Sequence, residues 1–295
     1  MSSPGTPMSV RADGLDLAYV ERGEGVPVVF VHGSVNDFRS WRRQIDTFSE
    51  RYRAVAYSRR YHWPNQPPAA GDVFSIAQHV ADLADVIINL GLAPAHIVGS
   101  SYGAMTALTL AIEEPALLRS LVLGEPPLLP WLPGLAGGQA LLDTFLSSAF
   151  HPAGEAFARG ETREGVRTFI DGVIGAGAFD RMGPPAQASM LDNAEVERLE
   201  TVTPSDQYFP ALTPADVAPL QVPVLLLKGE KSPPMFGLIT DELARVLPTA
   251  ERITIPGASH GMHAQNPAAY NDAVFAFLAR QDRRDDLAAR GGASG

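Results

Sequence analysis

Residues 95–108 read AHIVGSSYGAMTAL, and this stretch decides the fold. A short apolar run leads into the pentapeptide GSSYG, which has the pattern G-x-S-x-G, and a run of helix-forming residues follows. This order predicts a strand, a sharp turn with Ser101 at its tip, and a helix whose positive end faces a developing oxyanion. Glycines flank the serine because side chains at Gly99 and Gly103 would collide with neighbouring backbone. We therefore interpret Ser101 as a nucleophile.

Length and composition predict a globular protein of one elaborated domain, or of one and a half. The 295 residues are 45% hydrophobic, so the chain can bury a large core. A net charge of -10 without a dense Lys/Arg cluster disfavours nucleic acid and anionic membranes as partners. No apolar run approaches the roughly 20 residues that span a bilayer, and the absence of cysteine excludes disulfides and thiolate chemistry. The first ten residues lack the pattern of a signal peptide, so we expect a cytoplasmic protein.

Strand-like and helix-like runs alternate along most of the chain. The run at 26–31 is continuously apolar, as in a strand buried on both faces of a parallel sheet. The helix at 75–90 opens with a capping box formed by Ser75 and Gln78. The alternation predicts an α/β fold with a mostly parallel sheet flanked by helices. Further strands are expected near Val10 and at 15–20, 52–57, 118–123, 222–227 and 252–255, with later helices at 238–247 and 267–278.

The alternation stops at Pro126. Residues 126–135 are proline-rich and apolar, and helical stretches near 140–150, 162–174 and 186–199 follow with no strand between them. This pattern predicts a helical cap inserted into the sheet-containing core. We expect the core to span 1–125 and 215–282, the cap to span 126–214, and a disordered tail to occupy 283–295.

A serine hydroxyl requires a general base, and His260 is our candidate. It follows the strand expected at 252–255, in a loop of small residues that let the imidazole reach across the sheet ends. His263 is the alternative base. The remaining candidates are interpreted as surface or capping histidines: His62, His79, His96 and His151.

Two backbone N–H groups are expected to form an oxyanion hole about 3 Å from the developing charge. One belongs to Tyr102, the residue after the nucleophile, and the other to Ser34, in the loop after the strand at 26–31. Gly33 permits an unusual turn in that loop. His32 is expected to brace the loop by hydrogen bonding.

Together these residues resemble the α/β-hydrolase superfamily over nearly the whole chain. The resemblance rests on His32-Gly33, the turn at 99–103, the cap insertion and the terminal segment GASH at 257–260. It implies the α/β-hydrolase fold and a Ser-His-acid triad that requires no metal or organic cofactor. It does not specify a substrate, because the fold serves esterases, lactonases, thioesterases, carbon–carbon hydrolases, lyases and cofactor-free dioxygenases.

The triad acid departs from the usual pattern. Most members carry it after the strand expected at 222–227, in a segment resembling G-x-x-D-P, whereas this chain reads GEKSP with Ser232 in the aspartate position. A hydroxyl cannot offset an imidazolium charge. The helix after Ser101 is followed by the strand at 118–123, and Glu125 ends that strand. Some members, including certain haloalkane dehalogenases, carry their acid at this place. We assign the acid to Glu125, with Glu230 as the alternative and a triad without a functional acid also open.

The favoured function is hydrolysis of a carboxylic ester or lactone through an acyl-serine intermediate. Dehalogenases and epoxide hydrolases of the superfamily use an aspartate nucleophile, so Ser101 disfavours both activities. The apolar cap suggests a small to medium hydrophobic substrate. Its candidate wall residues are Trp131, Leu128, Leu129 and Phe145.

Two alternatives stay open. One is carbon–carbon cleavage or cofactor-free oxygenation of a ring substrate, whose anionic or enolic group could bind Arg59, Arg60 and His62. The similar dioxygenases usually carry histidine before the serine, where this chain has Ser100, which lowers that possibility. The other is a ligand-binding protein without turnover, against which the retained serine and histidine argue. The sequence leaves the oligomeric state open.

Overall fold

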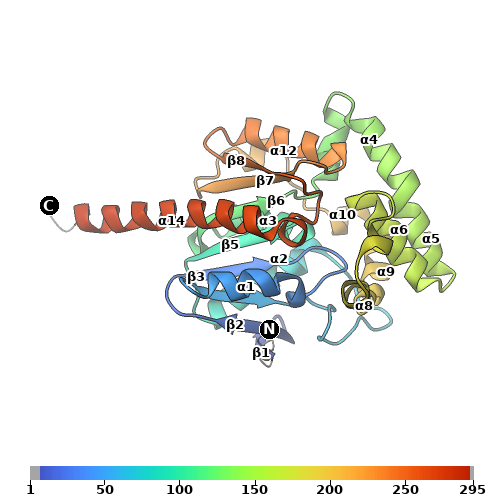
Figure 1. Cartoon of the computed structure of the whole chain (residues 1–295), viewed down its shortest axis with the longest axis horizontal. Helices are drawn as coiled ribbons and strands as arrows, with labels where there is room; N and C mark the ends of the chain where they lie inside the picture. The colour runs from blue at the N-terminus through green and yellow to red at the C-terminus, as the bar shows by residue number, and fades with distance from the viewer. Residues whose placement is uncertain (1–6, 293–295) are drawn as a thin grey trace.

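The computed structural model describes residues 7–292, with side chains described as far as residue 284. An eight-stranded sheet forms its centre, in the order β1-β2-β4-β3-β5-β6-β7-β8 (Figure 1). The first two pairings, β1 with β2 and β2 with β4, are antiparallel, and all others are parallel. The strands are β1 (Met8–Ala12), β2 (Leu15–Arg22), β3 (Pro27–Val31), β4 (Arg53–Tyr57), β5 (Ala95–Ser100), β6 (Leu118–Gly124), β7 (Val224–Gly229) and β8 (Glu251–Ile255).

Helices cover both faces of this sheet, which confirms the α/β-hydrolase fold. Val28 and Phe30 of β3 belong to one buried cluster, and Val29 and Val31 belong to the other. Because successive side chains of a strand point to opposite faces, the continuous apolar run is explained by burial on both sides. The core helices are α1 (Arg42–Phe48), α2 (Ile76–Asn89), α3 (Tyr102–Glu113), α12 (Pro234–Val246), α13 (Met262–Gln265) and α14 (Pro267–Gly292), with the short 3-10 helices η1 (Phe38–Trp41) and η2 (Pro115–Leu117).

Most expected elements appear within two residues of their predicted bounds. The hydroxyl of Ser75 accepts a hydrogen bond from the backbone N–H of Gln78, at 3.2 Å, at the start of α2. Helix α12 begins four residues before the expected start at Leu238, with Pro234 in its first turn. Proline is favoured in the first turn because its missing N–H would have no helical partner there.

Helix α14 is longer than the sequence suggested. It runs from Pro267 to Gly292, whereas we expected it to end near Leu278 and a disordered tail to begin at 283. No proline interrupts this segment, and glycine appears only at its last turn. Residues 293–295 of the expected tail lie outside the described residues. Figure 1 shows α14 projecting beyond the sheet. Within the described residues, no helix has the length and apolar character needed to cross a membrane.

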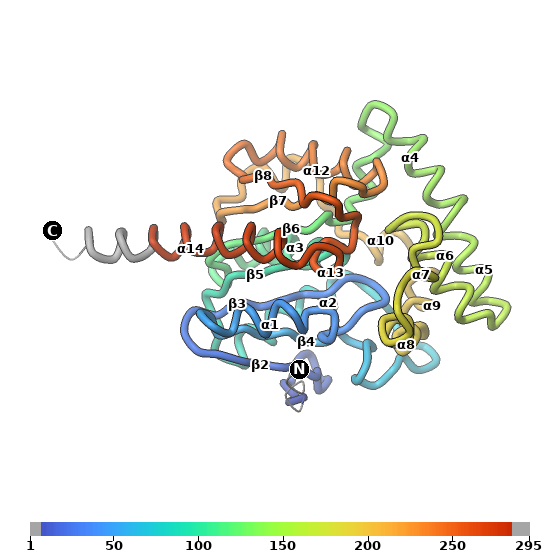
Figure 2. Tube along the Cα trace, viewed as in Figure 1, coloured from blue at the N-terminus to red at the C-terminus, as the bar shows by residue number. Residues whose placement is uncertain are grey.

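The segment between β6 and β7 is helical. Figure 2 shows most of its helices gathered at one end of the sheet, opposite the end toward which α14 projects. The helix expected at 186–199 is divided in two near Asn193. The helices of this insertion are η3 (Leu129–Gly134), α4 (Gly138–Phe145), η4 (Leu146–Phe150), α5 (His151–Ala158), α6 (Thr162–Ile174), α7 (Ala178–Arg181), α8 (Pro184–Leu191), α9 (Ala194–Val202), α10 (Ser205–Tyr208) and α11 (Pro214–Val217).

Candidate active site

Ser101 lies at the sharp turn between β5 and α3. Its backbone has φ 53° and ψ -124°, a conformation that costs a non-glycine residue on the order of 1–3 kcal/mol. A Cβ at Gly103 would lie 2.3 Å from the carbonyl oxygen of Val31, and one at Gly99 would lie 2.6 Å from Cα of Ala104. The two glycines therefore allow β5, α3 and the end of β3 to pack closely around the serine.

His260 and Glu125 form a buried pair at the same end of the sheet. Nδ1 of His260 lies 2.7 Å from Oε2 of Glu125, and the backbone N–H of Gly229 donates to the other carboxylate oxygen at 2.8 Å. Glu125 is fully buried and His260 is 6% exposed. The Phe236 ring stacks on the imidazole, with centroids 3.9 Å apart and planes 12° apart. Among the described residues, Nε2 of His260 has no hydrogen-bond partner, so the ring is fixed with this nitrogen free.

The alternative acid and base have other partners. Oε2 of Glu230 accepts a hydrogen bond from the backbone N–H of Gly257 at 2.6 Å, in the turn before the His260 loop. The ring of His263 stacks on Trp41, with centroids 4.3 Å apart. Burial, with a smaller effect of the nearby His260, lowers the pKa of His263 to about 4. Glu230 therefore stabilises a turn, and His263 is buried against Trp41.

The loop after β3 lies against the serine. A Cβ at Gly33 would lie 2.8 Å from Cβ of Ser101 and 3.5 Å from its Oγ, so only glycine fits here without a shift. Nδ1 of His32 lies 2.8 Å from the carbonyl oxygen of Gly33, and its Nε2 accepts a hydrogen bond from the backbone N–H of Arg59 at 2.9 Å. The hydrogen is therefore assigned to Nδ1. His32 braces the loop as expected, and Ser34 of this loop lines the same cavity as Ser101.

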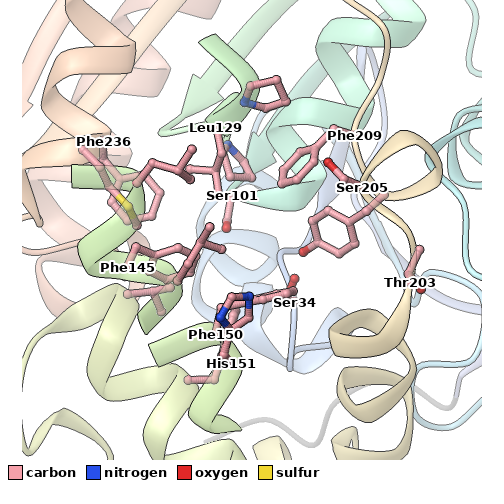
Figure 3. Close-up of a pocket in the computed structure, with 18 residues that line it drawn as sticks. Ser34, Ser101, Leu129, Phe145, Phe150, His151, Thr203, Ser205, Phe209 and Phe236 are labelled. Carbon is pink, nitrogen blue, oxygen red and sulfur yellow. The ribbon is translucent and has the colours of Figure 1, made fainter. Parts of the chain in front are cut away.

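A cavity of about 330 Å³ opens over Ser101 beneath the inserted helices. Figure 3 shows Ser101 between Phe145 and Phe209, with Ser34 close by. Two of the expected wall residues, Leu129 and Phe145, line the cavity. Most of the other lining side chains are apolar, among them Phe150, Phe169 and Phe236. Among the described residues, no three His, Cys, Asp or Glu side chains are placed to hold a metal ion.

The other two expected wall residues pack elsewhere. Leu128 and Trp131 are absent from the described lining of the cavity, and both are buried in the larger of the two apolar clusters. The indole N–H of Trp131 donates to the carbonyl oxygen of Leu212 at 2.7 Å. Trp131 thus connects the start of the insertion to the segment before α11, and the structure does not place either residue among the described lining where we expected substrate contacts.

The cationic residues after β4 face inward. Both oxygens of Asp82 accept hydrogen bonds from the Arg60 guanidinium at 2.7 Å. Arg59 is only 1% exposed, and its Nη2 lies 3.2 Å from Nε2 of His62 and 3.6 Å from Oε1 of Glu200. None of these three basic side chains is among the described cavity-lining residues, so the expected site for an anionic substrate is a set of buried contacts.

The sequence analysis did not identify two polar residues of the insertion, Glu200 and Tyr208. The Ser34 hydroxyl donates to Oε2 of Glu200 at 2.6 Å, and the Tyr208 hydroxyl donates to the same oxygen at 3.1 Å. Glu200 lies 166 residues from Ser34, so no local motif connects them. The available signal was the spacing of Glu197 and Glu200, which places both carboxylates on one face of α9. Both are fully buried.

The chain belongs to the α/β hydrolase family, which it matches over residues 28–273. It is similar to epoxide hydrolase 3 of Mus musculus, 29% identical over 167 residues that cover 46% of each protein. It is also similar to the sn-1-specific diacylglycerol lipase ABHD11 of Mus musculus, 27% identical over 263 residues covering 85% of this chain and 80% of that one. The chain spans less than half the length of several curated relatives that it matches.

Solved structures give the same fold. Est816, described as an N-acyl homoserine lactone degrading enzyme, has a TM-score of 0.73 at 23% identity and covers 92% of this chain and 100% of its own. The carboxylesterase CesB of Bacillus subtilis has a TM-score of 0.70 at 22% identity, covering 92% of this chain and 91% of its own. Identities this low show the shared fold alone.

Proposed function

We propose that this α/β hydrolase cleaves a carboxylic ester or lactone through an acyl intermediate on Ser101. The observation that carries the proposal is the buried contact between His260 and Glu125, which leaves Nε2 of the imidazole free. Phe236, which stacks on this imidazole, also lines the cavity into which Ser101 opens. A serine, an oriented imidazole and a buried carboxylate are the groups that acyl transfer requires.

In the proposed mechanism Ser101 Oγ attacks the carbonyl carbon while Nε2 of His260 accepts its proton. The Glu125 carboxylate offsets the charge of the resulting imidazolium and holds the ring in one orientation. Backbone N–H groups of Tyr102 and Ser34 donate to the oxyanion. The imidazolium then protonates the leaving alkoxide. Water repeats the sequence on the acyl group, releasing the acid and restoring Ser101, so this chemistry uses no metal or organic cofactor.

The apolar cavity supports a small to medium hydrophobic substrate. The similar structures named as a carboxylesterase and a lactone-degrading enzyme support the same substrate class. Epoxide hydrolases among the curated relatives support a different reaction. Epoxide hydrolases of the superfamily use an aspartate nucleophile at the turn between strand and helix, where this chain has Ser101. We therefore favour ester or lactone hydrolysis.

Hydrolysis of p-nitrophenyl butyrate tests this proposal. We expect the wild-type protein to release p-nitrophenol over many turnovers, with an initial burst if deacylation is slower than acylation. The Ser101→Ala variant should fold normally and lose nearly all of this activity, since loss of a triad serine costs on the order of 10⁶ in kcat in a well-studied protease. Turnover that survives in purified Ser101→Ala, or a wild-type protein inert toward both p-nitrophenyl butyrate and simple lactones, would contradict the proposal.

A further inference from the structure

The cavity has a polar corner formed by Ser34 and Tyr208, which lie on different sides of the boundary between core and insertion. Both residues line the cavity. Both hydroxyls donate to one oxygen of Glu200, at 2.6 Å from Ser34 and 3.1 Å from Tyr208. The three residues therefore form one hydrogen-bonded unit between the cavity and the buried interior.

The hydrogen bonds to Glu200 determine which hydrogen-bonding groups of Ser34 and Tyr208 remain available to a ligand. A hydroxyl has one hydrogen to donate and lone pairs with which to accept. Since the hydrogens of Ser34 and Tyr208 are committed to Glu200, the parts of these hydroxyls that remain for a ligand are acceptors. The corner is thus able to receive a hydrogen bond and poorly able to donate one.

The groups around Glu200 favour this arrangement. Its Oε1 lies 3.6 Å from the Arg59 guanidinium, which stays protonated in proteins. His62 faces the same oxygen at 3.9 Å, but burial keeps the pKa of His62 well below its usual range, so it adds no charge. Burial and the charge of Glu200 raise the pKa of Glu197 well above its ordinary value. Burial raises the pKa of Glu200 as well, whereas the Arg59 charge and the hydrogen bonds from Ser34 and Tyr208 act against this rise. Among the described residues neither carboxylate oxygen of Glu197 has a hydrogen-bond partner, so Glu200 is the acceptor for both hydroxyls.

We propose that the substrate's acyl chain carries a hydroxyl group close to the scissile carbonyl and donates it to Ser34 and Tyr208. The inference rests on the proposed hydrolase function and specifies its substrate class. The backbone N–H of Ser34 is proposed to bind the oxyanion, so its side chain lies within a few atoms of the carbonyl carbon. Glu200 is a positioning residue that turns both hydroxyl hydrogens away from the substrate. Leu129, Phe145 and Phe169 provide apolar contacts for the rest of the chain.

A pair of shape-matched esters tests the inference. Methyl 3-hydroxybutyrate and methyl 3-methylbutyrate differ by a hydroxyl in place of a methyl group, and a pH-stat measures the hydrolysis of both. We expect kcat/KM for the hydroxy ester to exceed that for the methyl analogue by at least about 10-fold, because polar groups left unpaired in a site disfavour the analogue. A ratio near or below one, with both esters hydrolysed, overturns the inference and leaves the proposed function standing.

Two variants identify the groups responsible for this preference. Tyr208→Phe removes only the hydroxyl, since the hydrogen bond from Tyr102 goes to the backbone carbonyl of Tyr208. It should reduce the preference ratio about fivefold or more. Ser205→Ala is the matched control, because this hydroxyl also lines the cavity on α10 but has no hydrogen bond to Glu200 among the described contacts. An unchanged ratio in Tyr208→Phe, or an equal loss in Ser205→Ala, contradicts the assignment.

Binding to the Ser101→Ala variant separates this inference from the proposed reaction. Chemical-shift titration with the two intact esters measures affinity without turnover. Tighter binding of the hydroxy ester, reduced by adding Tyr208→Phe, supports the acceptor corner whether or not the wild-type protein hydrolyses esters. Equal affinity for the two esters overturns it. Absence of Ser101-dependent turnover, by contrast, overturns the reaction itself.

Discussion

The carboxylate of Glu125 lies 2.7 Å from Nδ1 of His260, although 135 residues separate the two in the sequence. Glu125 follows the end of β6, and His260 lies in the loop after β8. Strand β7 lies between these strands, and its last residue, Gly229, donates its N–H to the same carboxylate at 2.8 Å. The acid that contacts the imidazole is therefore the residue directly after β6, while the backbone of β7 helps to hold it.

Replacing this carboxylate tests its proposed role. Glu125→Gln should reduce kcat for ester hydrolysis by roughly 10³- to 10⁴-fold with little change in KM, because an amide cannot stabilise the imidazolium; the corresponding change in a serine protease costs about 10⁴. Glu230→Gln is the matched control and should cost far less, since Glu230 contacts the Gly257 turn. Steady-state kinetics on p-nitrophenyl butyrate measures both. Near wild-type activity in Glu125→Gln with collapse in Glu230→Gln would reverse the assignment.

Ser232 allows a gain-of-function test at the end of β7. Its Oγ is buried and, among the described residues, has no hydrogen-bond partner. If this position retains triad geometry, adding Ser232→Asp to Glu125→Gln should restore part of the lost kcat. Single-turnover acylation rates report this recovery directly. A double variant no faster than Glu125→Gln would mean that only the β6 position can serve the imidazole.

The two histidines of the last loop should behave differently. His260→Ala should abolish ester hydrolysis nearly as completely as Ser101→Ala, because no other base is proposed to activate the serine. His263→Phe preserves an aromatic ring against Trp41, so the kcat of the folded variant should stay within a few-fold of wild type. Steady-state measurements of kcat for the two variants, made in parallel, test this difference. A reversed order of losses would move the base to His263.

Burial of His263 also predicts acid sensitivity of the fold. Its pKa falls from the ordinary 6.5 to about 4, so between these values the unfolded chain binds the proton more readily than the folded protein. His263 therefore does not reduce the free energy of unfolding above about pH 6.5, and its effect lowers this free energy as the pH falls toward 4. Between pH 7.5 and 5 the loss from this residue is about 2 kcal/mol.

The His263→Phe variant isolates this contribution from those of other buried histidines. Urea unfolding at pH 7.5 and 5.0 should show a smaller pH-dependent loss of unfolding free energy in the variant than in wild type. The difference between the two losses should be about 2 kcal/mol. Identical losses would mean that His263 does not stay neutral in the folded protein.

Close packing at the turn predicts a strong dependence on Gly103. A Cβ there would lie 2.3 Å from the carbonyl oxygen of Val31 and 2.5 Å from that of His32, and backbone cannot move aside easily. Gly103→Ala should lower the free energy of unfolding by at least about 2 kcal/mol. At Gly134 a Cβ would meet no atom within 4 Å, so Gly134→Ala should change stability by less than about 0.5 kcal/mol. Equal effects in denaturant titrations would contradict this description of the turn.

The sequence predicted the sheet-based core well because its signals are local. The run at 26–31 is continuously apolar, the turn at 99–103 contains its two glycines, and the helix at 75–90 begins with the capping residue Ser75; the structure has β3, the turn between β5 and α3, and α2 at these places. Glu125 could be proposed because the usual acid position holds Ser232. Burial on both faces leaves a chain segment few alternatives to a central strand.

The cavity wall could not be predicted in the same way. Apolar character alone does not separate substrate contacts from packing, and Trp131 and Leu128 lie in the larger apolar cluster and outside the described cavity lining. The acceptor corner depends on Ser34, Tyr208 and Glu200, which meet only when the insertion folds onto the core. Such long-range contacts leave no trace in the local sequence pattern.

The central claim is that Ser101 becomes acylated during turnover, and covalent labelling with diethyl p-nitrophenyl phosphate tests it most directly. We expect intact-mass spectrometry to show one diethylphosphoryl group per chain, with stoichiometric release of p-nitrophenol and loss of esterase activity. Peptide mapping should place the group on Ser101, and Ser101→Ala should remain unlabelled. A protein that hydrolyses esters but takes no label, or one labelled at another residue with Ser101 unmodified, would contradict the account.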